Sequence, residues 1–336
     1  AAPIHAQVPE AWRSEDLVFH TFSIAAVDPE TGEVGVAVTT RNACVGNGVP
    51  WVRAGVGAVA TQASTRTAYG DELLDRIAAG TSAADALERA LADDPGADRR
   101  QIGVASVDGG IAQHTGDAVD AWAGQRAGPD YAAQGNLLVG TEVLDAVAAD
   151  FESTRGTGRA LADRLVSALE AGQAQGGDAR TGRIQSAAVR VADGREGMAQ
   201  RPDGETVFIH VCEHWTPVAE VRRIHDTVSG TLGHRPLQRY AGSDVAQLKI
   251  ILHALGYFRP ELEELPRDAA LRQYDADAAA AVDAFRADQG LTTPEMGTPG
   301  GWVDAATVAA LWQGLADAGQ AVEIRRELRS LTRIRR

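Results

Sequence analysis

Thr21 and Ser23 are the first side chains in the sequence whose type and position could support catalysis. Both lie near the start of HTFSIAAVDPETGEVGVAV, which covers residues 20–38. Apolar residues alternate on both sides of DPETG, as in strands with one buried face, and DPETG supplies the proline and glycine of a tight reversal. The stretch therefore predicts a β-hairpin whose first strand begins with two hydroxyl-bearing residues.

The pairing within this hairpin decides what Thr21 faces. If the strands pair symmetrically about the turn, Thr21 lies opposite Thr40, beside Arg41 and Asn42. A cation and an amide in that position can depress the pKa of a nearby amine or hold an anionic substrate. A polar strand end that faces solvent explains the same pattern, and on spacing alone it is the simpler interpretation.

The sequence lacks the common signatures of cofactor and metal chemistry. It contains no HExxH, CxxC, P-loop, GxGxxG or GxSxG motif, so neither a nucleotide nor any other cofactor is expected. His210 and His214 lie four residues apart, but in a predicted strand that runs into a loop, where this spacing does not bring two side chains onto one face. We therefore expect no metal site.

The order of predicted elements indicates the fold class. Within residues 20–230 the pattern gives a strand pair, two helices, a strand pair around Asp108-Gly109, two helices, further strands and a last helix. Hairpin-linked strands pair antiparallel, which disfavours a doubly wound parallel sheet. The prediction is an α+β fold with antiparallel sheets covered by helices.

Composition limits the partners and the cellular location. A formal charge of −14 over 336 residues argues against binding nucleic acid, and no apolar run is long enough for a membrane span. The start AAPIHAQVPE resembles the product of signal peptidase, so we expect a secreted, periplasmic or cell-envelope protein, with the cytoplasm as the alternative. Cys44 and Cys212 could pair in an oxidising compartment, but two buried thiols are the favoured interpretation.

Changes in composition and periodicity along the sequence predict five segments. They are an N-terminal extension at 1–19, the α+β domain at 20–230, a linker at 231–240, a small all-α domain of three helices at 241–316, and a basic C-terminal helix at 317–336.

Four ordered motifs give the region 20–230 a resemblance to a known family. They are TFSIAAVDPETGEVGVAV, VPWVRAGVGAVATQA, QGN at 134–136 and GGDARTGRIQSAA at 176–188. Together they resemble an uncharacterised bacterial and archaeal family of the Ntn-hydrolase superfamily. The resemblance implies an αββα four-layer sandwich and a class of mechanism, without a particular substrate.

In that mechanism a Thr, Ser or Cys at the start of its chain attacks an amide, and its own α-amine, with an unperturbed pKa of roughly 7.7 to 8.0, acts as the base. The resemblance implies Thr21 as nucleophile. The other predicted catalytic residues are Ser23 as the alternative nucleophile, Arg41, which the hairpin pairing places beside Thr21, and Asn136, whose amide could stabilise the oxyanion. The predicted substrate-binding residues are Asn42, Gln62, Asp178, Arg183, Gln185 and Ser186.

The sequence departs from the family pattern at two places. Thr21 follows His20 and an extension, so a free Thr21 amine requires cleavage of the bond between them. The stretch VCEHWTP carries Cys212 and Glu213 where an acidic pair is expected before the histidine. The chain is accordingly a precursor, an enzyme in which another base activates Thr21 or Ser23, or a non-catalytic member.

The C-terminal helices have a resemblance of their own. GSDVAQLKIILHALGYF, YDADAAAAVDAFRADQGL and GWVDAATVAAL are similar to the three-helix peptidoglycan-binding-like domain. The matching positions are mostly core and capping residues, which report the fold better than the ligand. Peptidoglycan is thus an expected partner of residues 241–316, and docking to another partner is the alternative.

Three functions follow from these resemblances. The first is an Ntn-type amidohydrolase that cleaves a small molecule or peptide and carries a wall-binding module. The second is a non-catalytic, envelope-associated binding or scaffold protein. The third is a peptidoglycan amidase. The sequence leaves open whether the chain forms a homo-oligomer.

Overall fold

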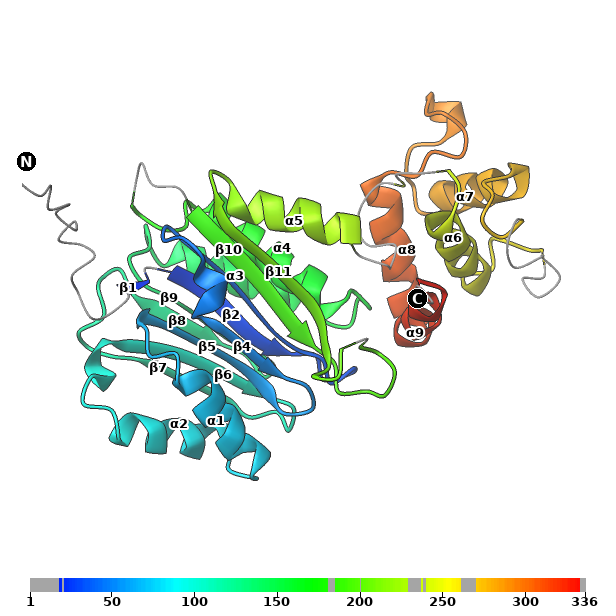
Figure 1. Cartoon of the computed structure of the whole chain (residues 1–336). Helices are drawn as coiled ribbons and strands as arrows, with labels where there is room; N and C mark the ends of the chain where they lie inside the picture. The colour runs from blue at the N-terminus through cyan, green and yellow to red at the C-terminus, as the bar shows by residue number, and fades with distance from the viewer. Residues whose placement is uncertain are drawn as a thin grey trace, which may run out of the picture. The chain divides into compact units, whose positions relative to one another are not determined.

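The computed structural model of the chain (Figure 1) describes residues 18–19, 21–180, 185–199, 201–228, 237, 240–260 and 270–332. Two compact units can be distinguished. The first comprises the described residues of Ala1–Phe151 and Leu165–Val221, and the second those of Glu152–Arg164 and Arg222–Arg336. Each unit has its own hydrophobic core.

The larger sheet of the first unit is antiparallel throughout. Its strands are β2 (Thr21–Val27), β3 (Val34–Thr40), β8 (Gly124–Ala127), β9 (Tyr131–Gly135), β10 (Gln185–Ala192) and β11 (Glu205–His214), in the spatial order β11-β10-β3-β2-β9-β8. The β2–β3 hairpin confirms the predicted pairing of Thr21 with Thr40. Asp28 N donates to Glu33 O at 2.8 Å and closes the turn.

The smaller sheet is also antiparallel. It consists of β1 (Val18–Phe19), β4 (Pro50–Arg53), β5 (Gly57–Ser64), β6 (Arg100–Ser106) and β7 (Ile111–Thr115). The order is β1-β5-β6-β7, and β4 pairs with another part of β5. Pairing of β6 with β7 confirms the second predicted hairpin, around Asp108-Gly109. The fold class is mixed α and β with two antiparallel sheets.

Helices cover the outer faces of both sheets (Figure 1). Helices α1 (Tyr69–Ala78) and α2 (Ala83–Ala92) bury Leu73, Leu74 and Leu87 against the smaller sheet, and each such side chain contributes about 1.5–3 kcal/mol by leaving water. Helices α3 (Glu142–Ser153) and α4 (Leu161–Ala174) lie on the larger sheet. Tyr131 of β9 packs edge-on against Phe151 of α3 at a ring separation of 5.4 Å.

The layer between the two sheets changes character along the strands. Near the β2–β3 turn it is apolar, with a buried core that includes Ala25, Val27, Val34, Val36, Ala58 and Ala60. Toward the start of β2 the inward side chains are buried and polar: Thr21, Ser23, Gln62, Gln101, Gln134 and Asn136. This polar end contains several residues that the sequence analysis selects as site candidates.

The second unit contains α6 (Ser243–Ala254), α7 (Ala276–Asp288), α8 (Ala305–Asp317) and α9 (Ala321–Thr332), and α5 (Pro217–Val228) begins in the first unit and ends in the second. Asp275 caps α7 by accepting from Ala278 N, and Asp304 caps α8 by accepting from Thr307 N. Each cap also pairs with a buried cation, Lys249 for Asp275 and Arg286 for Asp304. The helix ends are therefore tied to the core of this unit.

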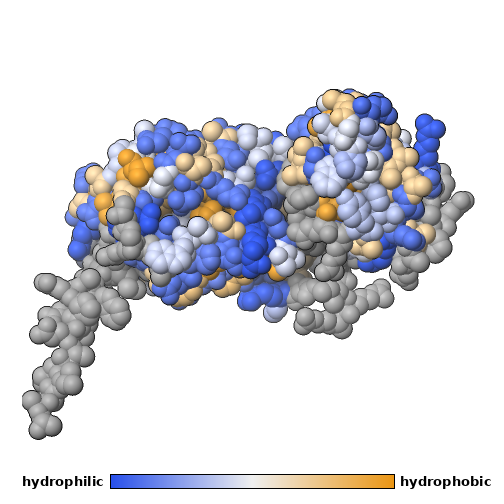
Figure 2. Space-filling model, turned by 90° about the horizontal axis from the view of Figure 1, so that it is seen from above, coloured by the Kyte–Doolittle hydropathy of each residue, from blue (hydrophilic) through white to orange (hydrophobic). Residues whose placement is uncertain are grey.

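The described surface is mainly hydrophilic on the face shown in Figure 2, where hydrophobic residues occur in small groups between hydrophilic ones. None of the helices in the described ranges has the length and apolar character that a bilayer crossing requires.

Candidate functional site

Thr21 occupies the start of β2 and is fully buried. Its Oγ1 donates to Thr40 Oγ1 at 3.2 Å. Its carbonyl oxygen accepts two hydrogen bonds, from Asn136 N at 3.0 Å and from Gln62 Nε2 at 3.1 Å. The backbone and the hydroxyl of Thr21 are thus held by residues of β3, β5 and the segment after β9.

Ser23 is the inward neighbour of Thr21 on the same strand face. Its Oγ donates to Gln62 Oε1 at 2.7 Å and accepts from Gln134 Nε2 at 2.6 Å. Ser23 therefore links the two sheets through a buried chain of amides. Its hydroxyl donates its one proton and accepts one hydrogen bond within this chain.

Gln101 fixes the orientation of the amides around it. Its Nε2 donates to the carbonyl oxygens of Gly135 at 2.9 Å and Gly124 at 3.2 Å, and to Thr115 Oγ1 at 3.1 Å. Because backbone carbonyls only accept, Gln101 Oε1 must point the other way, where Gln62 Nε2 donates to it at 2.8 Å.

The same constraint orients Asn136. Its Nδ2 donates to Gln101 Oε1 at 2.9 Å, so its Oδ1 points away from Gln101. Asn136 is buried, and its Oδ1 has no hydrogen-bond partner among the described residues. An unpartnered buried acceptor typically costs about 1–3 kcal/mol. Asn136, whose backbone N–H donates to the Thr21 carbonyl, therefore carries an acceptor without a partner within the described ranges.

A charged loop follows the polar end of β3. Arg41 N donates to Asp178 Oδ2 at 3.2 Å, and Arg41 Nε donates to the Asp178 carbonyl at 3.2 Å. Arg180 pairs with the same carboxylate through Nη2 at 2.5 Å and donates from Nη1 to Asn42 Oδ1 at 3.2 Å. Asp178 is thus a shared anion that holds both arginines beside the strand end. The predicted Arg183 lies outside the described residues.

Ser186 connects this loop to β10. It lies opposite Thr40, which in turn lies opposite Thr21. Ser186 Oγ donates to Asn42 O at 2.6 Å and accepts from Val45 N at 3.0 Å. The hydroxyl therefore fixes the backbone of the turn that follows β3.

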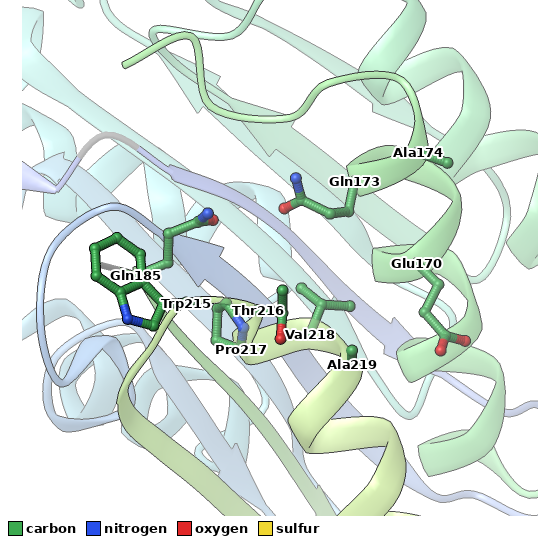
Figure 3. A pocket seen from close by; sticks show the side chains of 9 residues that line it. All are labelled: Glu170, Gln173, Ala174, Gln185, Trp215, Thr216, Pro217, Val218 and Ala219. Carbon is green, nitrogen blue, oxygen red and sulfur yellow. The ribbon is translucent and has the colours of Figure 1, made fainter. Parts of the chain in front are cut away.

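A pocket of about 290 Å³ adjoins Gln185, the residue before Ser186 (Figure 3). Its walls come from α4, the start of β10 and the turn between β11 and α5: Glu170, Gln173, Ala174, Gln185, Trp215, Thr216, Pro217, Val218 and Ala219. Trp215 is 68% exposed and stands beside Gln185 in Figure 3. Sequence analysis did not select Trp215, although a tryptophan directly before a helix start at the sheet end is a visible signal.

The cysteines correct one prediction. Cys44 and Cys212 form a disulfide across 168 residues, and Cys212 is exposed, so the expectation of two buried thiols is wrong. His210 lies next to them, and its Nε2 accepts from Gly46 N at 3.1 Å. Burial lowers the pKa of His210, so its imidazole is neutral near pH 7.

The structure brings the predicted residues together in two groups. Thr21, Ser23, Gln62 and Asn136 share one network, and Arg41, Asn42, Asp178 and Ser186 share the adjacent loop cluster. Sequence analysis missed Gln101, Gln134 and Arg180. The two glutamines carried a signal, because each is a polar residue at an inward position of a predicted strand.

A solved structure resembles this fold. The crystal structure of a DUF1028 protein from Silicibacter pomeroyi matches with a TM-score of 0.54 and 29% sequence identity, covering 62% of this chain and 88% of that one. No curated protein matches the chain.

The family assignment rests on the first unit. The match to the model of a family of unknown function, DUF1028, begins at the residue with which β2 starts and ends in α5. It covers residues 21–221, more than half of the 336 residues, and the chain therefore belongs to the DUF1028 family.

Proposed function

We propose that the chain is an Ntn-type hydrolase of amide bonds, with Thr21 as nucleophile and its α-amine as base once the bond before Thr21 is cut. The position of Thr21 carries this proposal. Its partners named above, Thr40, Gln62 and Asn136, are uncharged and do not act as bases near neutral pH. An amine on the same residue would supply the missing base.

The arrangement of the first unit supports the same mechanism. Two antiparallel sheets face each other and carry helices on their outer faces, as in the αββα sandwich of Ntn-hydrolases. In that architecture the nucleophile begins a strand at one end of the inner layer. Thr21 begins β2 at the polar end of the layer, and the family match also begins there.

Asn136 has a specific role in this proposal. One N–H of its Nδ2 is engaged by Gln101, and its buried Oδ1 is an acceptor without a hydrogen-bond partner in the part of the chain that the structure describes. We assign Oδ1 to accept a hydrogen bond from the Thr21 amine, which would remove the cost of the unpartnered atom. The second N–H of Nδ2 remains for the oxyanion role that the resemblance suggests for the Asn136 amide.

The uncut chain fits a precursor. Val18 and Phe19 pair with Ala63 and Ser64 in the smaller sheet, whereas Thr21 belongs to the larger one. Thr21 is fully buried in this state. Removal of the preceding residues would free the end of β5 and open the side from which a substrate amide approaches the hydroxyl.

The decisive experiment compares the full chain with a chain that begins at Thr21, using a fluorescent β-lactone as probe because such electrophiles acylate N-terminal threonine. We expect the probe to label Thr21 in the shortened chain and not in the full chain. Thr21→Ala should abolish labelling, and Thr21→Ser should retain it. Thr31→Ala is the matched control, since Thr31 is a buried threonine at the opposite end of the same hairpin, bonded to Glu33.

The hydrolase proposal would be contradicted if labelling persists in Thr21→Ala. It would also be contradicted if the chain that begins at Thr21 folds and is not labelled. The second candidate, a non-catalytic binding protein, is favoured by the complete burial of Thr21. Mass spectrometry of the protein from its native source tests that candidate. An intact bond before Thr21 would support it.

For residues 241–316, which lie in the second unit, we propose a peptidoglycan-binding-like module. The support is that Asp304 and Thr307, two positions of the motif, form the cap of α8, and that Val245, Leu248 and Phe285 lie in its core. Retention of the full chain on purified cell wall, competed by soluble wall fragments, tests the module. A full chain that is not retained on purified cell wall would contradict the proposal.

A further inference from the structure

Three potential metal ligands converge at the edge of the larger sheet. A ring nitrogen of His210 and the sulfur atoms of Cys44 and Cys212 all lie within 4.8 Å of one another. Cys44 precedes the short helix η2 (Val45–Asn47) and has a left-handed backbone, with φ 57° and ψ 40°. The Cys44 N–H donates to the Cys212 carbonyl at 2.7 Å, which ties the η2 segment to β11.

The backbone of β11 is adapted to this convergence. Gln185 pairs with His214 and Ala187 pairs with Val211, so Cys212 and Glu213 together oppose the single residue between them on β10. Such a bulge re-aims side chains and occurs often next to active sites. Here it accompanies the meeting of Cys212 with a residue that is 168 positions away.

The imidazole is also held in place. A Cβ on Gly46 would lie 2.7 Å from two ring carbons of His210, so this position requires a glycine. The Gly46 N–H donates to His210 Nε2 at 3.1 Å, which shows that the ring nitrogen offers a lone pair. A disulfide alone needs no imidazole acceptor at this place.

We propose that the reduced form of this cluster is a binding site for a thiophilic divalent cation such as Zn²⁺, with Cys44, Cys212 and His210 as ligands. The steps balance. Two equivalents of an external thiol reduce the disulfide to two cysteine thiols and form one external disulfide. Zn²⁺ then replaces the two thiol protons, which pass to water, and takes a lone pair of the His210 imidazole.

The geometry fits this chemistry. Zn–S bonds of about 2.3 Å and a Zn–N bond of about 2.0–2.1 Å place tetrahedral ligand atoms roughly 3.5 Å apart. The three ligand atoms already lie within 4.8 Å of one another, and reduction of the disulfide lets the two sulfur atoms move apart to that separation. Thiolate and imidazole ligands select zinc over magnesium and calcium, which prefer oxygen. Three protein ligands leave one tetrahedral position for water.

The site shares its backbone with the loop cluster beside Thr21. Ser186 Oγ bridges Asn42 O and Val45 N, the residues on either side of the Cys44 segment. Exchange between the disulfide and the metal-bound form would therefore shift the backbone of the turn that carries Arg41 and Asn42. This site is independent of whether Thr21 is a nucleophile.

The test uses the full chain, reduced with a phosphine under nitrogen and titrated with Co²⁺ as a spectroscopic substitute for zinc. We expect one equivalent to bind, with a thiolate-to-cobalt charge-transfer band and the visible bands of tetrahedral Co²⁺, and Zn²⁺ to displace it. The oxidised chain should give neither band. Cys44→Ser and Cys212→Ser should abolish the charge-transfer signature, and His210→Gln should weaken binding about tenfold or more.

His214→Gln is the matched control. His214 is an exposed histidine near the end of β11, and its Nδ1 accepts from Thr216 N at 3.1 Å, so it should leave Co²⁺ binding unchanged. If a cysteine variant misfolds, alkylating both thiols of the folded, reduced wild-type protein should block binding instead. Failure of the reduced chain to produce the charge-transfer band, or a band that survives alkylation or depends on His214, would overturn the proposal.

Discussion

The two ends of the layer between the sheets are built from different chemistry. Near the β2–β3 turn, Val27 and Val36 pack with Ala58 in a wholly apolar core. At the other end of the same strands, Ser23 and Gln62 take part in a network of amides and hydroxyls. The strands run without interruption between the two ends, so the comparison isolates the effect of the side chains.

The two ends differ in how strictly their side chains must be oriented. Apolar burial stabilises by about 25 cal/mol per Å² and demands no particular orientation. A buried amide contributes only when each donor and acceptor has a partner, and otherwise destabilises. The polar end therefore fixes the orientation of the Thr21 carbonyl, which accepts from the side-chain Nε2 of Gln62 and from the backbone N–H of Asn136.

The largest effect should come from Gln101→Met, which keeps the length of the side chain and removes its hydrogen bonds. Five groups lose a partner, including the carbonyls of Gly124 and Gly135. We expect the free energy of unfolding to fall by about 3–4 kcal/mol, measured by urea denaturation. A loss below about 1 kcal/mol would mean that the polar end behaves like the apolar one.

Gly103→Ala tests how tightly the amide network packs against the backbone of β6. A Cβ at Gly103 would lie 2.1 Å from Gln134 Oε1, so the amide that donates to Ser23 must move. We expect a loss of about 2–3 kcal/mol. In the Gln134→Ala background the same substitution should cost less, with a coupling energy of about 1–2 kcal/mol in the double-mutant cycle. Additive losses would contradict the fit.

The sequence was sufficient to predict the local part of this arrangement. DPETG and the alternating valines fix the β2–β3 register, because the turn and the buried face constrain it within a few residues. Thr21 consequently lies opposite Thr40, as predicted. Gln62 and Asn136 were also selected, and both contact the Thr21 carbonyl.

The network itself could not be predicted, because its contacts join residues that are far apart in the sequence. Ser23 and Gln134 pair across β2 and β9 of the larger sheet and are 111 residues apart, whereas Ser23 and Gln62 meet across the two sheets and are 39 apart. Period-two alternation shows that a glutamine faces inward, but it does not show which residue of the opposite sheet it meets. The same limit explains the incorrect prediction for Cys44 and Cys212, whose meeting depends on η2 and on a bulge in β11.

The reverse substitution, Val36→Thr, puts one hydroxyl into the apolar end at nearly constant shape. Val36 is fully buried in the apolar core between the sheets, so the new hydroxyl loses water without gaining an established partner. We expect a loss of about 2 kcal/mol in urea denaturation. Val36→Ala provides the size control, because it leaves a cavity without adding a polar group. A neutral Val36→Thr would show that this end also tolerates polarity.

Neighbouring residues of β6 give the smallest and most specific contrast. Gln101 serves the uncharged network, whereas Arg100 pairs with Asp94 at 2.9 Å outside it. Burial alone would raise the pKa of Asp94, but hydrogen bonds from Arg100, Gly96 N and Tyr69 outweigh it and lower the pKa to about 2. A depressed carboxyl pKa stabilises the fold above the unfolded pKa, and this contribution is lost as pH falls through the folded pKa.

The stability difference between wild type and Asp94→Asn should therefore shrink by about 1.5 kcal/mol from about pH 4 to about pH 2. The difference between wild type and Gln101→Met should stay constant over the same range, because every partner of Gln101 named above is uncharged. Urea denaturation at each pH measures both. A pH-dependent Gln101→Met difference would show that a titrating group reaches the polar end, and would identify a candidate base for Thr21 other than its own amine.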